Sequence, residues 1–366
     1  MRDRLARWIE RRLPKPQLRE GASGHPRLPV KRIIVFGRIP NPTFDYYLAA
    51  RLGARDMPPY QVADIRGGEV PSLEADGTFV ILCRYASPNV LRWLERNKER
   101  LSGVGLFLDD DIPAVVTGTD ADFFYRVFLW YRALWPLVRL NRHLDVVWAS
   151  TPHLASRLAG AKAVVLPPAP PLVLWQAARG NEEMHHQPTH EALIAYHATG
   201  VHLEEHRFLR PIIADVLRKR PKVRFEVFAD RRAKAIWQGL ERVQIREPMP
   251  WTEYLADAKA RRIDIMLVPL APSHVNDSRS PTKRIDIARY QAAAVFSVGA
   301  AYGSPDGSGE LRLPYAADTW RGAIFQLVDD SEMRRSVAAA TRQAVLQMTS
   351  AADTGLEVFK GRQAQP

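Results

Sequence analysis

The sequence of 366 residues contains a single cysteine, Cys83, so no disulfide can form within the chain. Proteins without disulfides are typical of a reducing compartment, and Cys83 follows the apolar run Phe79 to Leu82, which predicts a small core residue. No apolar run reaches the roughly 20 residues that span a membrane. The N-terminus also lacks the apolar segment of a secretory signal. These absences together predict a cytoplasmic protein.

The chain carries little net charge outside its first 32 residues, although its overall net charge is +12. Those 32 residues hold ten Lys and Arg against three acids, which gives +7 and leaves +5 for the remainder. Leu5, Trp8, Ile9 and Leu13 fall on one helical stripe among arginines, a pattern typical of a basic helix on an anionic membrane. We therefore expect residues 1–20 to contact the inner face of the plasma membrane, with a solvated or core-docked tail as the alternative. The sequence contains no recognition motif for nucleic acid, so we do not expect nucleic acid as a partner.

The sequence also lacks G-x-G-x-x-G, which excludes a nicotinamide-type fingerprint. What it does contain is an alternation of short apolar runs and helical patterns, which predicts an α/β fold with parallel sheets. We expect two Rossmann-like, doubly wound domains. The predicted strands lie at 32–36, 61–65, 78–83, 104–108, 145–149, 192–196, 223–228, 242–245, 265–268 and 294–298. The predicted helices lie at 44–52, 88–100, 151–159, 231–238, 251–260, 316–328 and 331–348.

The predicted domain boundaries follow changes in amino-acid composition along the chain. A basic tail (1–29) precedes the first domain (30–175), and a polar stretch with several histidines forms a linker (176–190). The second domain covers 191–349, and residues 350–366 are a segment that crosses back to the first domain. The first domain holds an unusually aromatic stretch, Phe123 to Leu140, with apolar residues over more than half of its circumference. This pattern predicts a buried helix, or else a contact with an acceptor or a membrane.

A polar turn after the predicted strand Ile265 to Val268 is the strongest candidate site. Ser280 at the N-cap and Pro281 at the first position predict a helix that runs to about Ala293. Lys283 and Asp286 then share a face near the helix start, where anions are favoured. This arrangement predicts a nucleotide-diphosphate site, in which Lys283 and nearby hydroxyls hold phosphate and Asp286 accepts from ribose. The residues concentrated in this turn are Asn276, Arg279, Ser280, Thr282, Lys283 and Asp286.

This turn resembles the donor-binding region of GT-B glycosyltransferases of the retaining, group-1 (family-4) type, where a Ser-Pro-x-Lys-x-x-Glu turn holds the sugar nucleotide. Asp286 replaces the Glu of that pattern, and Ser278 stands where many members carry an acid. The likeness covers residues 30 to 350 and is strongest from 192 to 298. It implies two domains that face each other across a cleft. It also implies sugar transfer from a nucleotide-diphosphate donor to a glycan or lipid-linked acceptor of a bacterial surface, with no cofactor and no required divalent metal.

The resemblance extends the predicted site to other strand ends. The turn after the first strand of the second domain is similar to a T-x-x-H segment that approaches the donor phosphates, which adds His197 and Thr199. Gly37 and Arg38, after the first strand of the chain, join the same donor set. Stabilisation of the charge that develops on the sugar is assigned to His202 or Asp110.

Three alternatives remain open on the residues alone. Asp109-Asp110-Asp111 follows a predicted strand and is similar to the metal-binding D-x-D of GT-A glycosyltransferases, in which Asp109 and Asp111 would hold a divalent ion. His202, Glu205 and His206 match H-x-x-E-H, the motif of a zinc hydrolase, although Pro211 is expected to interrupt their helix. A GT-B relative that binds nucleotide without catalysis is the third, because Ser278 replaces the acid.

Overall fold

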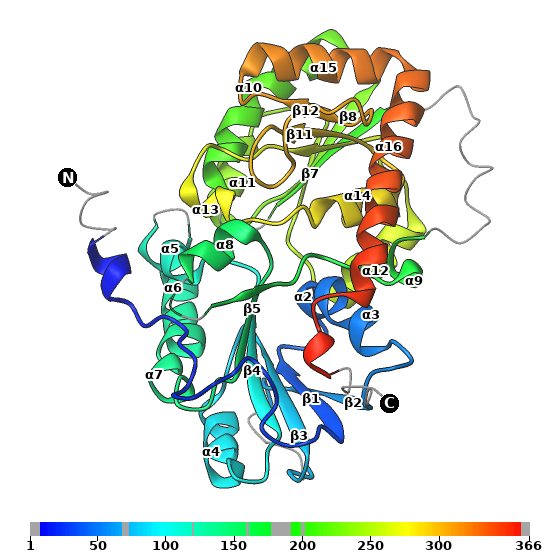
Figure 1. Cartoon of the computed structure of the whole chain (residues 1–366). Coiled ribbons are helices and arrows are strands. Elements are labelled where there is room, and N and C mark those ends of the chain that lie inside the picture. Colours follow the sequence, from blue (N-terminus) through cyan, green and yellow to red (C-terminus); the bar gives the residue numbers. More distant parts are fainter. Residues whose placement is uncertain are drawn as a thin grey trace. The chain divides into compact units, whose positions relative to one another are not determined.

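The computed structural model describes residues 8–67, 73–118, 121–158, 160, 162–176, 192–198 and 202–359, arranged in two compact units (Figure 1). Unit 1 comprises Met1–Pro171, Ser278–Ser280 and Met348–Pro366, and unit 2 comprises Leu172–Asp277 and Pro281–Gln347. The predicted linker lies outside the described residues from position 177 onward. No helix within the described ranges is both long and apolar enough to cross a membrane.

Unit 1 is built on a parallel sheet in the order β2-β1-β3-β4-β5-β6. Its strands are β1 (Arg32–Gly37), β2 (Tyr60–Asp64), β3 (Thr78–Cys83), β4 (Gly103–Leu108), β5 (Val146–Ala149) and β6 (Val164–Val165). Every residue of β3, β4 and β5 is buried, which explains why they appear in the sequence as continuous apolar runs. Gly105 allows β4 to pass the ring of Trp148, because a Cβ at this position would overlap that ring.

The helices of unit 1 begin where the sequence places polar caps. Asn41, Ser87 and Thr151 each accept a hydrogen bond from a backbone N–H of the helix that they precede, and a proline follows each of them. The helical segments are α2 (Pro42–Tyr47), α3 (Ala49–Leu52), α4 (Pro88–Asn97), α5 (Ile112–Thr117), α6 (Phe123–Leu129), the π-helix η1 (Trp130–Leu134), α7 (Leu137–Leu140), α8 (Pro152–Arg157), η4 (Ser350–Asp353) and η5 (Glu357–Phe359).

Unit 2 has a second parallel sheet in the order β12-β11-β10-β7-β8-β9. Its strands are β7 (Ala192–His197), β8 (Val223–Phe228), β9 (Val243–Arg246), β10 (Ile265–Val268), β11 (Ala293–Ser297) and β12 (Leu311–Leu313). Its helices are α9 (Leu172–Trp175), α10 (Leu203–Lys219), α11 (Arg231–Trp237), α12 (Trp251–Ala260), α13 (His274–Asp277), α14 (Lys283–Tyr290), α15 (Ala317–Asp329) and α16 (Ser331–Thr349). The short edge strand β12 was not predicted.

Three predictions of local structure are wrong. The helix at 44–52 is divided into α2 and α3. Pro211 does not interrupt α10, which continues to Lys219 because its buried residues on both sides of the proline, such as Leu209 and Ile212, pack into the core of unit 2. The turn before α14 also differs: Thr282, not Ser280, is the N-cap residue, and the helix ends at Tyr290 because Gln291 takes a left-handed conformation, with φ of 56°.

The aromatic stretch Phe123 to Leu140 is neither one helix nor fully buried. It is divided into α6, η1 and α7, whose inward residues Leu129, Leu134 and Leu137 enter the core of unit 1. Several of its aromatic side chains face outward, with Phe124 78% exposed. The prediction of burial fails because the stretch has more apolar residues than one core-facing side can accept.

Candidate functional site

The centre of unit 2 is a point where the strand order reverses. Strands β7 and β10 are neighbours there; the chain continues from β7 to β8 on one side and from β10 to β11 on the other. In open parallel sheets, ligands bind beyond the carboxyl ends of the strands at such a point. The segments that leave these two ends are residues 198–202 and 269–282, and most of the predicted donor residues come from them or from the start of α14. Thr199 lies outside the described residues.

A buried carboxylate joins these two segments. Glu205, in the first turn of α10, accepts from the backbone N–H of Ala271 at 3.1 Å and from Nδ2 of Asn276 at 3.0 Å. His202 Nδ1 lies 3.5 Å from its other oxygen. Burial raises the pKa of Glu205, but the hydrogen bonds and the charge of His202 outweigh it and lower the pKa to about 2. Asn276 and His202 are therefore held in place by Glu205, which the predicted donor set did not include although an acid in a first helical turn is a visible signal.

His197 lies in the interior of unit 2 rather than on an open turn. It is 4% exposed, and its ring stacks on Phe228 with centroids 4.0 Å apart. Burial lowers its pKa, which favours the neutral ring. In that form Nε2–H donates to Glu226 at 2.7 Å, and Nδ1 accepts from the hydroxyl of Tyr254 at 3.3 Å. Both nitrogens thus have protein partners, which places His197 beneath the site as part of its support.

The first turn of α14 carries a chain of charges that runs from the interior to the surface. Arg289, whose side chain is 5% exposed, donates to Leu174 O at 2.8 Å and lies 3.1 Å from Oδ1 of Asp286. The other carboxylate oxygen of Asp286 is 3.1 Å from Nζ of Lys283. Lys283 is 37% exposed, so its ammonium group reaches solvent while its position is fixed from beneath. Arg289, which the sequence prediction omitted, orients this chain.

The Gly/Ser-rich segment between β11 and β12 is anchored to the same helix. Arg284 donates to both oxygens of Glu310, at 2.8 and 2.6 Å, and Arg312 donates to Oε2 of Glu310 at 2.7 Å. The Glu310 side chain is fully buried. A buried carboxylate between two guanidinium groups is satisfied by charge-assisted hydrogen bonds, so this cluster has a structural explanation and holds the β11–β12 segment against α14.

The acidic triplet after β4 divides among separate partners within unit 1. Asp109 accepts from the hydroxyl of Thr43 at 2.8 Å and from Nε of Arg84 at 2.6 Å, and burial raises its pKa. Asp110 lies 2.9 Å from Arg84 and 3.6 Å from Arg279. Asp111 caps α5 and pairs with Arg157. No group of three His, Cys, Asp or Glu side chains that would suit a metal ion occurs in the part of the chain that the structure describes.

The remaining predicted residues of unit 1 also have defined places. The hydroxyl of Ser280 bonds to that of Tyr47, whose pKa burial raises. Gly37 ends β1 beside Cys83, at the point where the order of the first sheet reverses. Arg38 follows it, exposed, with its guanidinium 4.9 Å from the ring centre of Phe128.

The H-x-x-E-H residues do not form a metal-binding arrangement. His206 is 1% exposed, and its Nδ1 accepts from the indole N–H of Trp237 at 2.9 Å. Burial lowers its pKa to about 4. Glu205 is occupied by Ala271 and Asn276, as described above. The zinc-hydrolase alternative is therefore not favoured.

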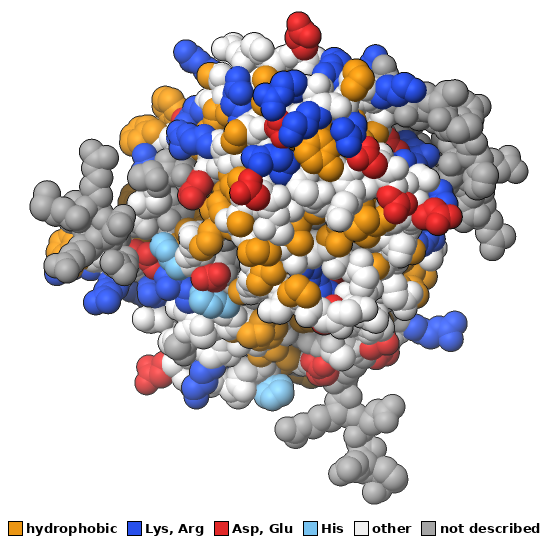
Figure 2. All heavy atoms as spheres, turned by 90° about the horizontal axis from the view of Figure 1, so that it is seen from above, with side chains coloured by type: hydrophobic (Ala, Val, Ile, Leu, Met, Phe, Trp, Pro, Cys, Tyr) orange, Lys and Arg blue, Asp and Glu red, His pale blue; other side chains and the backbone are white. Residues whose placement is uncertain are grey.

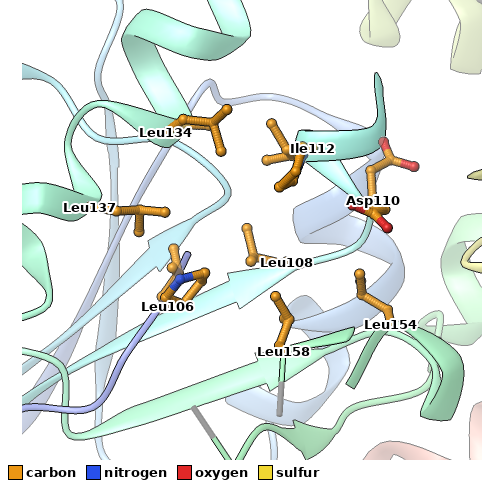
Figure 3. A pocket seen from close by; sticks show the side chains of 12 residues that line it. Leu106, Leu108, Asp110, Ile112, Leu134, Leu137, Leu154 and Leu158 are labelled. Atoms are coloured by element: carbon orange, nitrogen blue, oxygen red, sulfur yellow. The ribbon is translucent and has the colours of Figure 1, made fainter. Parts of the chain in front are cut away.

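Two other surface features have ordinary explanations. In unit 1 a cavity of about 20 Å³ lies among leucine side chains (Figure 3); it has room for one water molecule and none for a nucleotide.

On the side of unit 2 that carries α15, basic side chains gather (Figure 2). At the end of α10 in this unit, Lys219 lies 3.0 Å from Asp215 and Arg220 lies 2.6 Å from Asp329, as is usual for solvated helix ends.

Comparison with known proteins gives structural relatives only. No protein-family model matches the chain, and no curated protein matches its sequence. A glycosyltransferase from Rickettsia africae ESF-5 superposes with a TM-score of 0.56 at 11% identity, over 90% of this chain and 98% of that one. A sucrose-phosphate synthase from Thermosynechococcus elongatus superposes with a TM-score of 0.55 at 11% identity, over 88% of this chain and 96% of that one. The apo structure of OtsA superposes with a TM-score of 0.54 at 12% identity, over 92% of this chain and the whole of that one.

The chain has the GT-B fold. The predicted fold class is confirmed by these superpositions together with the two parallel sheets. A GT-B chain has two Rossmann-like units, whereas the GT-A alternative required only one nucleotide-binding domain and a metal held by Asp109 and Asp111. That alternative is not favoured, because the two carboxylates have different partners.

Proposed function

We propose that this GT-B protein is a glycosyltransferase that moves a sugar from a nucleotide-diphosphate donor to a glycan or lipid-linked acceptor, in the biosynthesis of a bacterial surface polysaccharide. The observation that carries the proposal is the convergence of polar side chains at the reversal of strand order between β7 and β10. The fold supports it, since the named structural relatives include glycosyltransferases.

The donor diphosphate would bind at the start of α14. Lys283 supplies a partly exposed ammonium group whose position is fixed by Asp286. Thr282, at the N-cap, makes no side-chain capping bond, so the helix start relies on other partners for its N–H groups. Ser280, Arg279 and Asn276 complete the predicted donor set, with Asp286 as the acceptor for ribose hydroxyls.

Catalysis would consist mainly of stabilising the departing diphosphate with positive charge from Lys283 and Arg279. We assign stabilisation of the positive charge on the sugar to His202 or Asp110, with retention of configuration. No divalent metal is needed in this scheme, because the basic side chains perform that role. Donor binding and turnover should therefore withstand a chelator.

We also propose a peripheral position on the cytoplasmic face of a membrane through the basic N-terminus. Residues 1–7 lie outside the described residues, and residues 8–12 are helical. Trp8 is 52% and Ile9 39% exposed, whereas Leu13 packs against the core of unit 1. Among the described residues of the predicted stripe, Trp8 and Ile9 therefore face outward and Leu13 does not.

The test begins with native mass spectrometry of the protein against a panel of nucleotide sugars, followed by calorimetry with the best donor. Lys283→Ala should weaken nucleoside-diphosphate binding by about 1.5 to 3 kcal/mol, the usual contribution of a hydrogen bond to a charged group. Lys234→Ala is the matched control, because Lys234 is an exposed lysine of α11 in the same unit. Equal affinity of the wild type and Lys283→Ala, with the fold intact, would refute the donor site.

Release of nucleoside diphosphate from the bound donor then separates an enzyme from a binding module. We expect turnover with an acceptor extract, and its loss in Lys283→Ala. Donor binding without turnover across a broad panel of acceptors would favour the non-catalytic alternative, which Ser278 in place of an acid keeps open.

A further inference from the structure

An exposed aromatic surface on unit 1 has no role in the proposed reaction. It lies on the outer side of α6, η1 and α7, and we call it the aromatic face. The exposed fractions of its first members are 62% for Phe123, 78% for Phe124 and 46% for Val127. The complete set is Phe123, Phe124, Val127, Trp130, Tyr131, Trp135 and Val138. Large exposed apolar patches mark binding surfaces in soluble proteins.

The π-helical turn η1 keeps these residues on one side. Trp135 N–H donates to Trp130 O at 2.8 Å, which closes a turn that holds one residue more than an α-turn. In an uninterrupted α-helix, position 134 would share the face of position 123, since eleven residues make about three turns. The extra residue moves Leu134 into the core and brings Trp135 outward instead. The inserted turn therefore extends the aromatic face by a tryptophan.

The inner side of the same segment is fixed, so the aromatic face is a permanent feature of unit 1. Leu129, Leu134 and Leu137 are each at most 3% exposed and belong to the core of unit 1. Leu134 and Leu137 point into the small leucine-lined cavity (Figure 3). Rotation of the segment to hide its outer rings would pull these leucines out of the core.

The segment that follows the N-terminal helix passes the end of α7 (Figure 1). Nδ2 of Asn141, just after α7, donates to Lys15 O at 2.9 Å, and Pro16 lines the same cavity as Leu134. The helix itself presents Trp8, with Arg12 stacked 4.1 Å from its ring centre. Its only acid among residues 8–12, Glu10, is buried and pairs with Arg157.

Charge identifies the occupant. Residues 121–143 contain four arginines, of which Arg139 pairs with Glu95 of α4, and a single acid, Asp122; the first 32 residues carry +7. Tryptophan and tyrosine favour the boundary between lipid headgroups and acyl chains, and arginine favours anionic headgroups. We propose that the aromatic face and the adjoining N-terminal helix together dock unit 1 onto an anionic lipid bilayer, with the rings of α6 and η1 in the interfacial layer.

The test is binding to vesicles of phosphatidylcholine with and without phosphatidylglycerol. The wild type should bind the anionic vesicles, bind pure phosphatidylcholine much less, and dissociate as salt rises. The triple variant Phe123→Ser, Phe124→Ser, Trp130→Ser should bind about ten-fold more weakly or worse. The matched control is Val173→Ser with Leu346→Ser, which removes exposed apolar side chains of unit 2, 84% and 46% exposed, and should bind as the wild type does.

A second measurement does not depend on the folding of a variant. Brominated acyl chains should quench the tryptophan fluorescence of the full-length wild type on anionic vesicles. Absence of wild-type binding to anionic vesicles, absence of quenching, or equal binding by the folded triple variant would each overturn the proposal. If the triple variant instead converts a dimer to a monomer and binds vesicles normally, the aromatic face is an interface between copies of this chain, and the proposal is wrong.

Discussion

Glu226 holds together the charged cluster beneath the candidate donor site, and Glu226→Gln tests how much that cluster stabilises unit 2. Its carboxylate is 1% exposed and contacts Nε2 of His197 at 2.7 Å, Nη1 and Nη2 of Arg261 at 2.7 and 2.6 Å, and Nη1 of Arg246 at 3.4 Å. Both arginines also pair with Asp257. The substitution keeps the shape of the side chain and removes its charge.

Two independent estimates of the magnitude agree. Burial raises the pKa of Glu226, but the hydrogen bonds from His197 and Arg261 outweigh it and lower the pKa from 4.5 to about 2. At about 1.4 kcal/mol for each pKa unit, this corresponds to roughly 3 kcal/mol of folding stability at neutral pH. Breaking a buried ion pair costs about 3 to 5 kcal/mol. The lower end of this range applies because the side chains of Arg261 and Arg246 are about a quarter exposed and remain paired with Asp257 after the substitution.

Native-state hydrogen exchange measures this loss for unit 2 separately. Amides of β8 should exchange about 100-fold faster in Glu226→Gln at neutral pH, while amides of β3 in unit 1 serve as an internal control. The exposed Glu241 gives a matched substitution, Glu241→Gln, with no expected effect. Unchanged β8 protection in Glu226→Gln would show that the cluster does not stabilise the fold.

The same contact predicts a dependence on pH with a definite sign. Because the folded pKa lies below the unfolded one, the stabilisation is present above about pH 4.5 and is lost as pH falls through the folded value near 2. The difference in β8 protection between wild type and Glu226→Gln should therefore shrink from about 3 kcal/mol at pH 5 to about 1 kcal/mol at pH 2.5. A difference that stays constant over this range would contradict the assignment of the effect to the carboxylate charge.

Further outcomes can be measured on single variants. Gly105→Ala should destabilise unit 1 by about 1 to 3 kcal/mol in calorimetry, because the added methyl group overlaps the Trp148 ring; unchanged stability would mean that the ring moves aside at no cost. Asp286→Asn should lower the stability of unit 2 by about 3 kcal/mol, because it leaves the buried Arg289 without its carboxylate, and should also weaken donor binding because an amide accepts less strongly. Normal donor affinity in Asp286→Asn would remove Asp286 from the ribose site. Chelation with EDTA should change neither donor affinity nor turnover, and loss of either would refute the metal-independent scheme.

The sequence was sufficient to predict those parts of the fold that depend on local patterns. The apolar runs that became β3, β4 and β10 are buried on both faces, so periodicity and length identified them as strands of parallel sheets. Caps such as Asn41, Ser87 and Thr151 act through neighbouring backbone groups, so their helix starts are signalled locally in the sequence; the predicted starts at 44, 88 and 151 compare with 42, 88 and 152 in the structure. Lys283 and Asp286 are three residues apart on a helix, and their contact was likewise readable.

The tertiary structure decided what depends on partners distant in sequence. The sequence alone could not show that His197 would be enclosed by Glu226 and Tyr254, or that Glu205 would join two turns through Ala271, 66 residues away. It could not place Arg289 beneath Asp286, because an arginine in a last helical turn is usually solvated. The outward side of the aromatic stretch was hidden for a related reason. Hydrophobicity states how many side chains favour burial, but only the packed core sets how many it can accept, and the π-turn at Trp130 determined which rings remained outside.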